Sequence, residues 1–352
     1  MTIRLLILGT GGMANAHVEA YVQMSDVAVV AGVDTDPERL EDFMAKHSIP
    51  NGFASVQEAL DWGEFDAVAN VTPDAVHHPT TLPLLAAGKH VLCEKPLAAN
   101  ETDAKEMAAA AKEAGVINMV NLTYRNVPAV MHAATMVSNG DIGEVRHFEA
   151  SYLQSWLTQP LWGDWRSESQ WLWRLSQKHG SLGVLGDVGV HILDFATLVA
   201  GANPTDVSCR LTTFHKAEGD QIGEYPLDAN DSFNMHLALT NGAAGVVHAS
   251  RFASGHINDL RLRIFGTKGG LDVRFVGETS KLYACLEPDL QSANWQEVDT
   301  PEVKTNYRRF IEAIQSGVPA LPDFDRGAVL QTALDAAVAS DGDGGKNTPV
   351  SI

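Results

Sequence analysis

The sequence predicts an α/β protein with two domains: a Rossmann-type, doubly wound parallel sheet, followed by an α+β domain with an open, mostly antiparallel sheet. Short apolar runs alternate with helical segments over residues 1–122, whereas apolar and polar residues largely alternate after about residue 145. A length of 352 residues is enough for two separate cores. We therefore place the domain boundary between residues 122 and 123, and assign 123–352 to the second domain.

The first domain is predicted from its nearly continuous apolar runs. Such runs are typical of strands that are covered on both faces, as in a parallel sheet. Helical segments lie between them at 36–47 and 102–115, and the second of these ends at a glycine. The alternation of strand and helix implies right-handed crossovers. The predicted strands are 3–9, 27–34, 65–72, 90–94 and 116–122.

The second domain is predicted from alternating patterns at 145–153, 206–214, 232–240 and 260–266, which suit half-buried antiparallel strands. Asn241 and Gly242 favour a tight hairpin between two of these strands. One face of such a sheet is left available for a partner, so we expect a homodimer or a homotetramer.

Composition excludes several classes of partner. The net charge of −19 repels phosphate backbones and anionic lipid, so we expect neither nucleic acid nor a membrane surface as a partner. The sequence holds no run of 18 uncharged apolar residues, and its start does not resemble a signal peptide. Three scattered cysteines without a CxxC pair argue against disulfides and structural zinc. We therefore expect a cytoplasmic protein.

The glycine-rich stretch "GTGGMA" lies between the first strand and the first helix, where a dinucleotide-binding turn is expected. Gly9 permits the tight turn, Gly11 lets the backbone approach a pyrophosphate, and Ala14 keeps the helix close to the sheet. The amide groups of the helix N-terminus add hydrogen-bond donors. The residues assigned to this turn are Gly9, Gly11, Gly12, Met13 and Ala14.

Asp34 ends the second predicted strand, twenty positions beyond Ala14, where a carboxylate can accept hydrogen bonds from a ribose 2′-hydroxyl. A carboxylate repels a 2′-phosphate, and we expect the nearby Arg39 to face away on its helix. The sequence therefore favours NAD over NADP.

Four further stretches, taken with the glycine turn, resemble the glucose–fructose oxidoreductase/inositol dehydrogenase (Gfo/Idh/MocA) family nearly from end to end. They are "NVTPDAVHHP" (70–79), "CEKP" (93–96), "NLTYRNVPAV" (121–130) and "GDVGVHILD" (186–194). The resemblance implies an NAD(P)-dependent oxidoreductase that interconverts a secondary hydroxyl and a ketone on a monosaccharide, a sugar derivative or a cyclitol. Residues 1–122 would bind NAD(P), and 123–352 would bind substrate and form the oligomer contacts.

The resemblance also implies a catalytic trio of Lys95, Asp187 and His191, all three in contact with substrate. An imidazole suits this chemistry because it titrates near neutral pH and can accept the alcohol proton. Asp187 and His191 are four residues apart and share one face if a helix begins there. Lys95 would stabilise a developing alkoxide and also contact the cofactor.

The family pattern assigns further cofactor contacts to the loops after the third and fourth strands. It also suggests a cis bond between Lys95 and Pro96. These cofactor contacts are Thr72, Pro73, Asp74, His77 and Glu94.

Five of the seven tryptophans fall between residues 156 and 173, interleaved with arginines and amides. They suit either a satellite core under a long loop or an active-site wall on which a sugar ring stacks. On the second reading, Trp162 and Arg166 bind substrate. Arg125 is a candidate substrate or cofactor contact, with a structural salt bridge as the alternative.

Two alternative functions stay open at this point. One is a sugar lyase or glycosidase that uses NAD for a transient oxidation without net redox change, since fold does not fix the reaction. The other is a non-catalytic NAD(P) or sugar sensor. We expect no metal, because no Cys/His cluster with ligand spacing occurs.

Overall fold

The computed structural model describes residues 2–160 and 162–351 and divides the chain into two compact units. The first contains the residues up to Leu122 together with Lys304–Gln331, and the second contains Thr123–Val303 and the residues from Thr332 onward. The division after Leu122 falls where the sequence analysis placed it. Residues 304–331 do not follow that assignment, because Phe310 and Ile311 are fully buried in the core cluster of the first unit.

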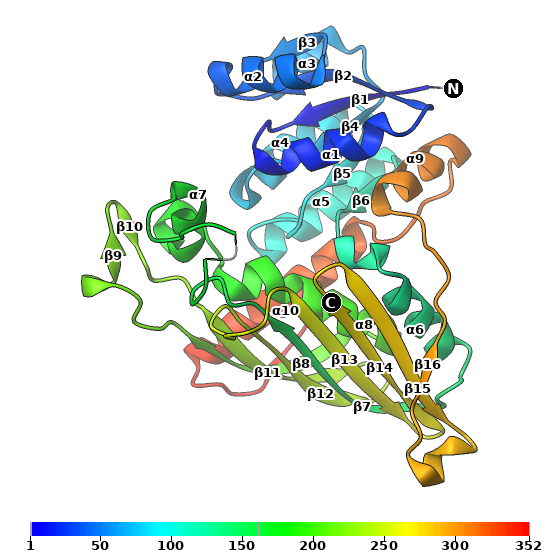
Figure 1. The fold of residues 1–352 in the computed structure, drawn as a ribbon. Coiled ribbons are helices and arrows are strands. Elements are labelled where there is room, and N and C mark those ends of the chain that lie inside the picture. Colours follow the sequence, from blue (N-terminus) through cyan, green and yellow to red (C-terminus); the bar gives the residue numbers. More distant parts are fainter. Residues whose placement is uncertain (1, 161, 352) are drawn as a thin grey trace. The chain divides into compact units, whose positions relative to one another are not determined.

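The sheet of the first unit has six parallel strands in the order β3-β2-β1-β4-β5-β6 (Figure 1). This order reverses direction between β1 and β4, and open α/β sheets bind ligands at the carboxyl ends of the strands beside such a point. The strands are β1 (Ile3–Leu8), β2 (Val27–Val33), β3 (Asn51–Phe53), β4 (Ala67–Asn70), β5 (His90–Cys93) and β6 (Asn118–Val120).

Five of these strands were predicted from their apolar runs. The sequence analysis missed β3, which has only three residues and contains an asparagine and a glycine, so it carries no apolar run. The helices of this unit are α1 (Gly12–Val22), α2 (Pro37–His47), α3 (Val56–Trp62), α4 (His77–Ala86), α5 (Glu101–Ala114) and α9 (Asn306–Ser316).

The sheet of the second unit has nine strands in the order β16-β15-β14-β13-β7-β12-β11-β8-β17. It is mostly antiparallel, as predicted, with one parallel pair between β7 and β12. The hairpin at Asn241–Gly242 is confirmed, since it connects the antiparallel strands β11 and β12. The strands are β7 (Val145–Leu153), β8 (Pro204–Thr212), β11 (Ser232–Leu239), β12 (Ala244–Ser250), β13 (Asp259–Gly266), β14 (Gly269–Val276), β15 (Thr279–Leu286), β16 (Gln296–Val298) and β17 (Thr348–Pro349).

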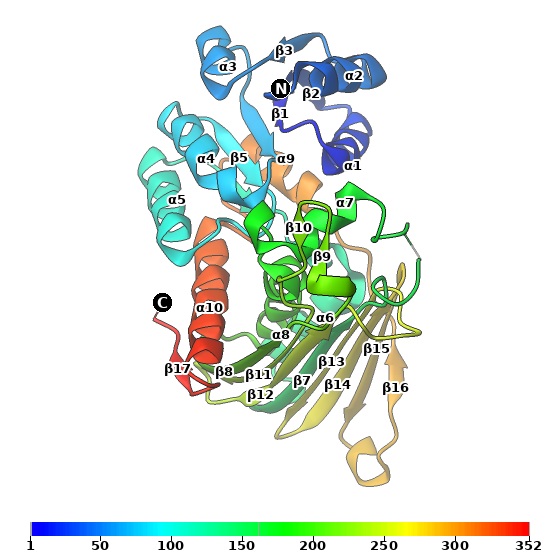
Figure 2. The same ribbon diagram turned by 90° about the vertical axis from the view of Figure 1, so that its left-hand side faces the viewer.

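The two faces of this sheet differ in what covers them. Along β13, Leu260, Leu262 and Ile264 are fully buried toward the side where helix α8 packs. The alternate residues Arg261 and Arg263 point to the other face, which no helix of the second unit covers within the described residues (Figure 2). The sheet therefore has one buried face and one open face, as the alternating pattern predicted.

The helices of the second unit are mostly short. The longer ones are α6 (Pro128–Ser138), α8 (Val190–Ala200) and α10 (Phe324–Gly342), which begins within the segment assigned to the first unit. The helix α7 (Ser169–Leu172) and the small hairpin of β9 (Gln221–Ile222) and β10 (Tyr225–Pro226) lie in the long connections of the sheet. Across the described part of the chain, no helix combines the length and apolar character needed to cross a membrane.

Candidate active site

The glycine turn after β1 has the backbone shape that a dinucleotide site requires. Gly9 has a φ of +87°, and a Cβ there would lie 2.9 Å from the carbonyl oxygen of Val71. Gly11 is the N-cap of α1 and provides no side-chain cap, and a Cβ at Gly11 or Gly12 would meet nothing within 4 Å. Ala14 is fully buried against the sheet. The helix N-terminus therefore opens onto space that would admit a pyrophosphate.

Asp34 follows β2 and accepts hydrogen bonds at both carboxylate oxygens. Its Oδ2 accepts from the backbone N and the hydroxyl of Thr10, both at 2.8 Å, and its Oδ1 accepts from the N of Asp36 at 3.0 Å. Burial alone would raise the pKa of Asp34, but these bonds and the guanidinium of Arg39 hold it well below its usual value. Asp34 is therefore a fixed anion at the end of β2.

The expectation that Arg39 faces away was wrong. Its Nε and Nη2 donate to Asp34 Oδ2 at 3.0 Å and to Oδ1 at 2.6 Å. Helix α2 starts directly after its N-cap Asp36, so Arg39 lies in the first turn, beside the end of β2. A cation therefore stands next to the carboxylate that was expected to exclude a 2′-phosphate.

The loop after β4 is held by buried polar side chains. Asn70 accepts hydrogen bonds from the backbone N and the hydroxyl of Thr72 at 3.2 and 2.7 Å. Pro73 and Asp74 continue this loop into a short helical turn. The imidazole of His77 is fully buried between the carbonyl oxygens of Thr72 (2.8 Å) and Pro96 (2.9 Å). His77 therefore connects the two predicted cofactor loops by its ring.

Glu94 follows β5 and lies in a polar network that joins distant parts of the first unit. Its Oε1 lies 2.8 Å from His17 Nε2 on α1 and accepts from Asn121 Nδ2 at 2.7 Å. Asn121 in turn contacts the hydroxyl of Tyr307 on α9 at 3.2 Å. The backbone N of Lys95 donates to Glu94 Oε2 at 3.3 Å, and the bond from Lys95 to the following proline is cis, as the family pattern suggested.

The network keeps Glu94 ionised. Burial raises the pKa of this carboxyl, but the hydrogen bonds from His17 and Asn121 and the charge of Lys95 outweigh burial and lower it from 4.5 to about 2. The anion is fixed at the carboxyl edge of the parallel sheet, next in sequence to the predicted catalytic lysine.

In the second unit, Asp187 and His191 occupy one continuous helical stretch. Asp187 lies in a π-helical turn, η5 (Leu185–Gly189), which runs directly into α8, and His191 is the second residue of α8. Single π-turns within helices are frequent at functional sites. The imidazole of His191 is buried and meets the ring of Tyr124 edge to face, with centroids 5.0 Å apart. The predicted helix start is thus present.

A set of hydroxyl and amide groups surrounds Tyr124. Its hydroxyl lies 2.5 Å from that of Tyr152, which donates to Asn258 Oδ1 at 2.6 Å, and Asn258 Nδ2 donates back to Tyr124 at 3.1 Å. Burial raises the pKa of Tyr152 well above its usual value, and the nearby charge of Asp187 acts in the same direction. These neutral hydroxyls provide hydrogen-bonding groups on the same side of the unit as Asp187.

Arg125 forms a buried salt bridge, which is the structural role that was predicted as the alternative. Its Nε and Nη2 donate to Asp194 Oδ2 and Oδ1 at 2.8 and 2.7 Å, and both side chains are almost fully buried. Asp194 lies in α8, which is buried on nearly all sides, so its carboxylate needs a buried partner. This bidentate ion pair fixes the short helix η2 (Thr123–Asn126) to α8.

The tryptophan-rich segment has a buried part and an exposed part. Trp156 and Trp165 are buried in a satellite core. Trp162 is 39% exposed and stacks on Trp171, and the guanidinium of Arg166 lies over Trp165 with its side chain largely in solvent. Trp162 and Arg166 are therefore accessible to solvent, while Trp156 and Trp165 pack in the core beneath the segment.

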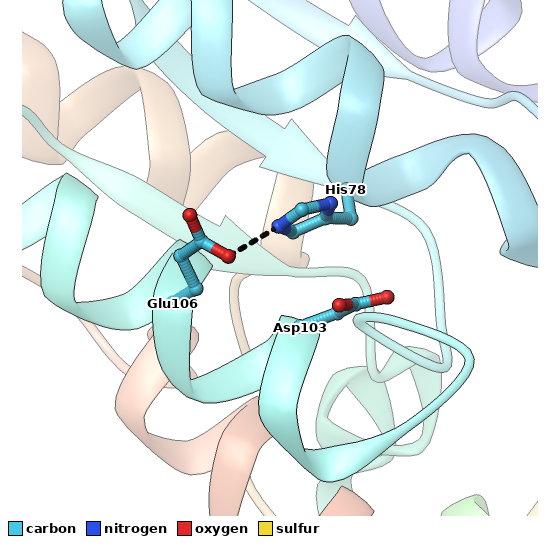
Figure 3. A group of neighbouring side chains, drawn as sticks. All are labelled: His78, Asp103 and Glu106. Atoms are coloured by element: carbon cyan, nitrogen blue, oxygen red, sulfur yellow. Dashed lines mark hydrogen bonds and ion pairs between the residues drawn. The ribbon is translucent and has the colours of Figure 1, made fainter.

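One group of side chains with the composition of a metal site occurs among the described residues, and its histidine directly follows His77 in the sequence. His78 of α4 faces Asp103 and Glu106 of α5 (Figure 3). His78 Nε2 lies 2.9 Å from Glu106 Oε2, while Asp103 accepts from Asn100 in the cap of α5. An ion pair between two helices and a helix cap account for all three side chains.

Together the parallel sheet, the glycine turn and the fixed acid after β2 define a dinucleotide-binding oxidoreductase class. The comparisons agree. Residues 3–122 match the family model described as "Oxidoreductase family, NAD-binding Rossmann fold", and residues 130–272 match the GFO/IDH/MocA C-terminal domain. The chain belongs to the Gfo/Idh/MocA oxidoreductase family, and its first unit is an NAD-binding Rossmann domain.

Similar proteins are named sugar and polyol dehydrogenases. Levoglucosan dehydrogenase of Pseudarthrobacter phenanthrenivorans is 29% identical over 75% of this chain and 72% of its own. The scyllo-inositol 2-dehydrogenase (NADP+) of Bacillus subtilis is 31% identical over 69% of this chain and 72% of its own. A levoglucosan dehydrogenase structure in complex with NADH and L-sorbose has a TM-score of 0.87 at 25% identity, covering 99% of both chains.

The sequence analysis did not find several residues that hold the predicted site in place. His17, Tyr152, Arg251 and Asn258 carry no local motif, and each contacts its partner across a long sequence separation. His17 was the one that the sequence could have indicated, because a histidine on the buried face of α1, beside Ala14 and Val18, needs a polar partner.

Replacing His17 with leucine should raise the pKa of Glu94, because burial remains while one hydrogen bond is lost. In the wild type, a pKa of about 2 against an ordinary 4.5 means that Glu94 stabilises the fold above pH 4.5, and this contribution is lost as the pH falls toward 2. In the variant the folded-state pKa lies closer to 4.5, so the protein should be less stable at neutral pH, and its loss of stability on acidification should be smaller and complete at a higher pH. Urea unfolding between about pH 3 and pH 7 measures this.

The control is His78→Leu, which removes an imidazole–carboxylate pair on the surface and should leave the loss of stability on acidification unchanged. If His17→Leu and the wild type lost stability identically on acidification, the network would not be what lowers the pKa of Glu94.

Proposed function

We propose that this protein is an NAD(P)-dependent dehydrogenase or reductase that interconverts a secondary hydroxyl and a ketone on a monosaccharide, a sugar derivative or a cyclitol. The observation that carries the proposal is Lys95 at the carboxyl edge of a dinucleotide-binding sheet, directly after the fixed anion Glu94. The names of the relatives, which include a levoglucosan dehydrogenase and an inositol dehydrogenase, support this substrate class.

In the proposed reaction, oxidation of the alcohol removes a proton from oxygen and a hydride from carbon. Bound NAD+ would supply the hydride acceptor. His191 takes the hydroxyl proton as general base and returns it in the reductive direction. Lys95 donates a hydrogen bond to the same oxygen and stabilises the alkoxide, while Asp187 binds a neighbouring hydroxyl and favours the protonated imidazole.

The cofactor residues have distinct tasks in this proposal. The amides of Gly11, Gly12 and Met13 face the pyrophosphate, and Asp34 faces the adenosine ribose. Thr72, Pro73, Asp74 and Glu94 border the nicotinamide end. Trp162 and Arg166 contact the outer part of the substrate, where an indole face suits the apolar face of a sugar ring.

Replacing Lys95 with methionine should lower kcat by at least about 100-fold, because the alkoxide loses its charged partner, while NADH affinity stays within about threefold. The assay is NADH absorbance across a panel of monosaccharides, anhydrosugars and inositols, with the dissociation constant measured by NADH fluorescence. Lys89→Met is the matched control, since Lys89 precedes the same strand, β5, and donates to the carbonyls of Gly63 and Phe65.

Wild-type protein that forms no NADH and consumes none across the panel would overturn the proposed function. Sustained turnover of a glycoside without added NAD would support the lyase or glycosidase instead. An unchanged rate in Lys95→Met would remove Lys95 from the mechanism.

Asp34 and Arg39 together should set the choice of cofactor, with NAD preferred. A ribose 2′-hydroxyl can donate to Asp34, whereas a 2′-phosphate needs the guanidinium of Arg39 to turn away from Asp34. The side chain of Arg39 is 48% exposed, so it is free to make this movement, and Asp34 keeps its bonds from Thr10 and Asp36. NADP binding is therefore weaker but not prohibited.

Asp34→Ala should weaken NADH binding by about 10- to 100-fold, the loss of one or two charge-assisted hydrogen bonds, with a smaller effect on NADPH. Arg39→Ala should instead weaken NADPH more than NADH. Titration calorimetry measures both, and Arg308→Ala, which removes an arginine paired with Asp26, is the control. Equal losses for the two cofactors in either variant would refute the assignment.

We also propose that the open face of the nine-stranded sheet joins copies of this chain into a homodimer or a homotetramer. Its residues include Arg261, Arg263, Phe265 and Tyr283 beside Trp295, which is 39% exposed. Aromatic and arginine side chains are the groups that interface cores favour. The acids Glu149 and Asp272 pair with arginines on this face, so charge does not oppose association.

Light scattering should give two or four times the 37.8 kDa chain mass, and Trp295→Glu should shift the protein toward the monomer. Val318→Glu, which also charges an exposed apolar position, should leave the mass unchanged. A wild-type mass of one chain would contradict the proposed oligomer.

A further inference from the structure

Arg251 is a completely buried cation in the second unit. It directly follows β12, and none of its side chain is exposed. Its Nη2 donates to Asp187 Oδ2 at 2.9 Å, its Nη1 donates to the carbonyl oxygen of Arg174 at 3.1 Å, and the guanidinium lies 5.1 Å from the ring centroid of Trp156. The proposed function assigns this arginine no role.

The pairing with Asp187 is required by the burial of Arg251. A guanidinium taken out of water needs a compensating anion, since an uncompensated buried charge is strongly destabilising. Asp231 is the other nearby carboxylate, and its Oδ2 is bound to the buried Lys216 at 2.5 Å. Asp187 is therefore the carboxylate that Arg251 holds directly.

The ion pair leads from the interior toward the surface. The side chain of Asp187 is 34% exposed, whereas that of Arg251 is not exposed at all. One carboxylate oxygen is thus anchored from within the protein, and the exposed part of the same group can meet a ligand. Such outer contacts orient the residues that touch a substrate or metal.

Arg251 also contacts the tryptophan-rich segment. Its bond to the carbonyl of Arg174, which accepts from Ser181 as well, reaches the end of that segment. Trp156, under the guanidinium, packs against Trp171 with centroids 5.6 Å apart. These contacts hold the planar guanidinium of Arg251 in place beside Asp187.

We propose that Arg251 is a positioning residue: it holds the carboxylate of Asp187 in one orientation, and the contacts with Trp156 and the Arg174 carbonyl keep its guanidinium in place. This inference rests on the proposed function, in which Asp187 binds a substrate hydroxyl. The effect of Arg251 on catalysis is then transmitted through Asp187, and disappears when Asp187 has lost its charge.

The test is a double-mutant cycle on kcat/KM with Arg251→Met, Asp187→Asn and the double variant. Arg251→Met should lower kcat/KM by about 10- to 100-fold, the usual cost of losing such an orienting contact, without changing NADH affinity. In the Asp187→Asn background the same substitution should change kcat/KM by less than about threefold. An equal loss in both backgrounds overturns the inference.

Arg251→Lys serves as the conservative variant and replaces methionine in the cycle if Arg251→Met does not fold. A lysine keeps the charge but cannot bind Asp187 and the Arg174 carbonyl as a planar fork, so its kcat/KM should lie between those of the wild type and Arg251→Met. A lysine variant as impaired as the methionine variant would contradict positioning by charge.

Lys216→Met is the matched control, because it removes another fully buried cation that pairs with Asp231 and not with Asp187. It should lower the unfolding midpoint yet leave kcat/KM within about threefold, and a loss as large as that of Arg251→Met would favour a merely structural role. Failure of the proposed function is distinguishable, since the wild type would then show no NAD-linked turnover at all.

Discussion

A charged group that leaves water must be paired inside the protein, and the candidate site depends on this constraint in both units. In the first unit, the carboxylate of Glu94 is enclosed by His17 and Asn121. In the second unit, the guanidinium of Arg251 is buried and forms an ion pair with the carboxylate of Asp187. Glu94 directly precedes Lys95, and Asp187 is itself proposed to bind a substrate hydroxyl.

The pairing also accounts for part of the fold of the first unit. Asn121, which binds Glu94, follows the edge strand β6 and contacts Tyr307 of α9. The segment 304–331 therefore returns to the first unit both to fill its core and to complete the polar network. The backbone N of Lys95 donates to Glu94, so the network also fixes the backbone of the proposed catalytic lysine.

Much of the fold could be predicted from periodicity. The apolar runs predicted five of the six parallel strands, and the alternating runs predicted the mostly antiparallel sheet. The strand β3 was missed because its three residues include an asparagine and a glycine and form no apolar run. The helix α9 was placed in the wrong unit because an amphipathic helix does not specify which core it covers. Arg39 differs from expectation for a related reason, since the direction of a side chain depends on its neighbours in space.

The sequence by itself determined the local features: the glycine turn after β1, the acid after β2, and a helix start that holds Asp187 and His191 four residues apart. Each is set by the conformational limits of a few adjacent residues, so a short pattern is enough to find it. Only the tertiary structure decided how the buried charges are paired. His17 and Glu94 are 77 residues apart and Asp187 and Arg251 are 64 apart. Such partners meet because separate strands and helices pack together, and no local pattern records which elements will be neighbours.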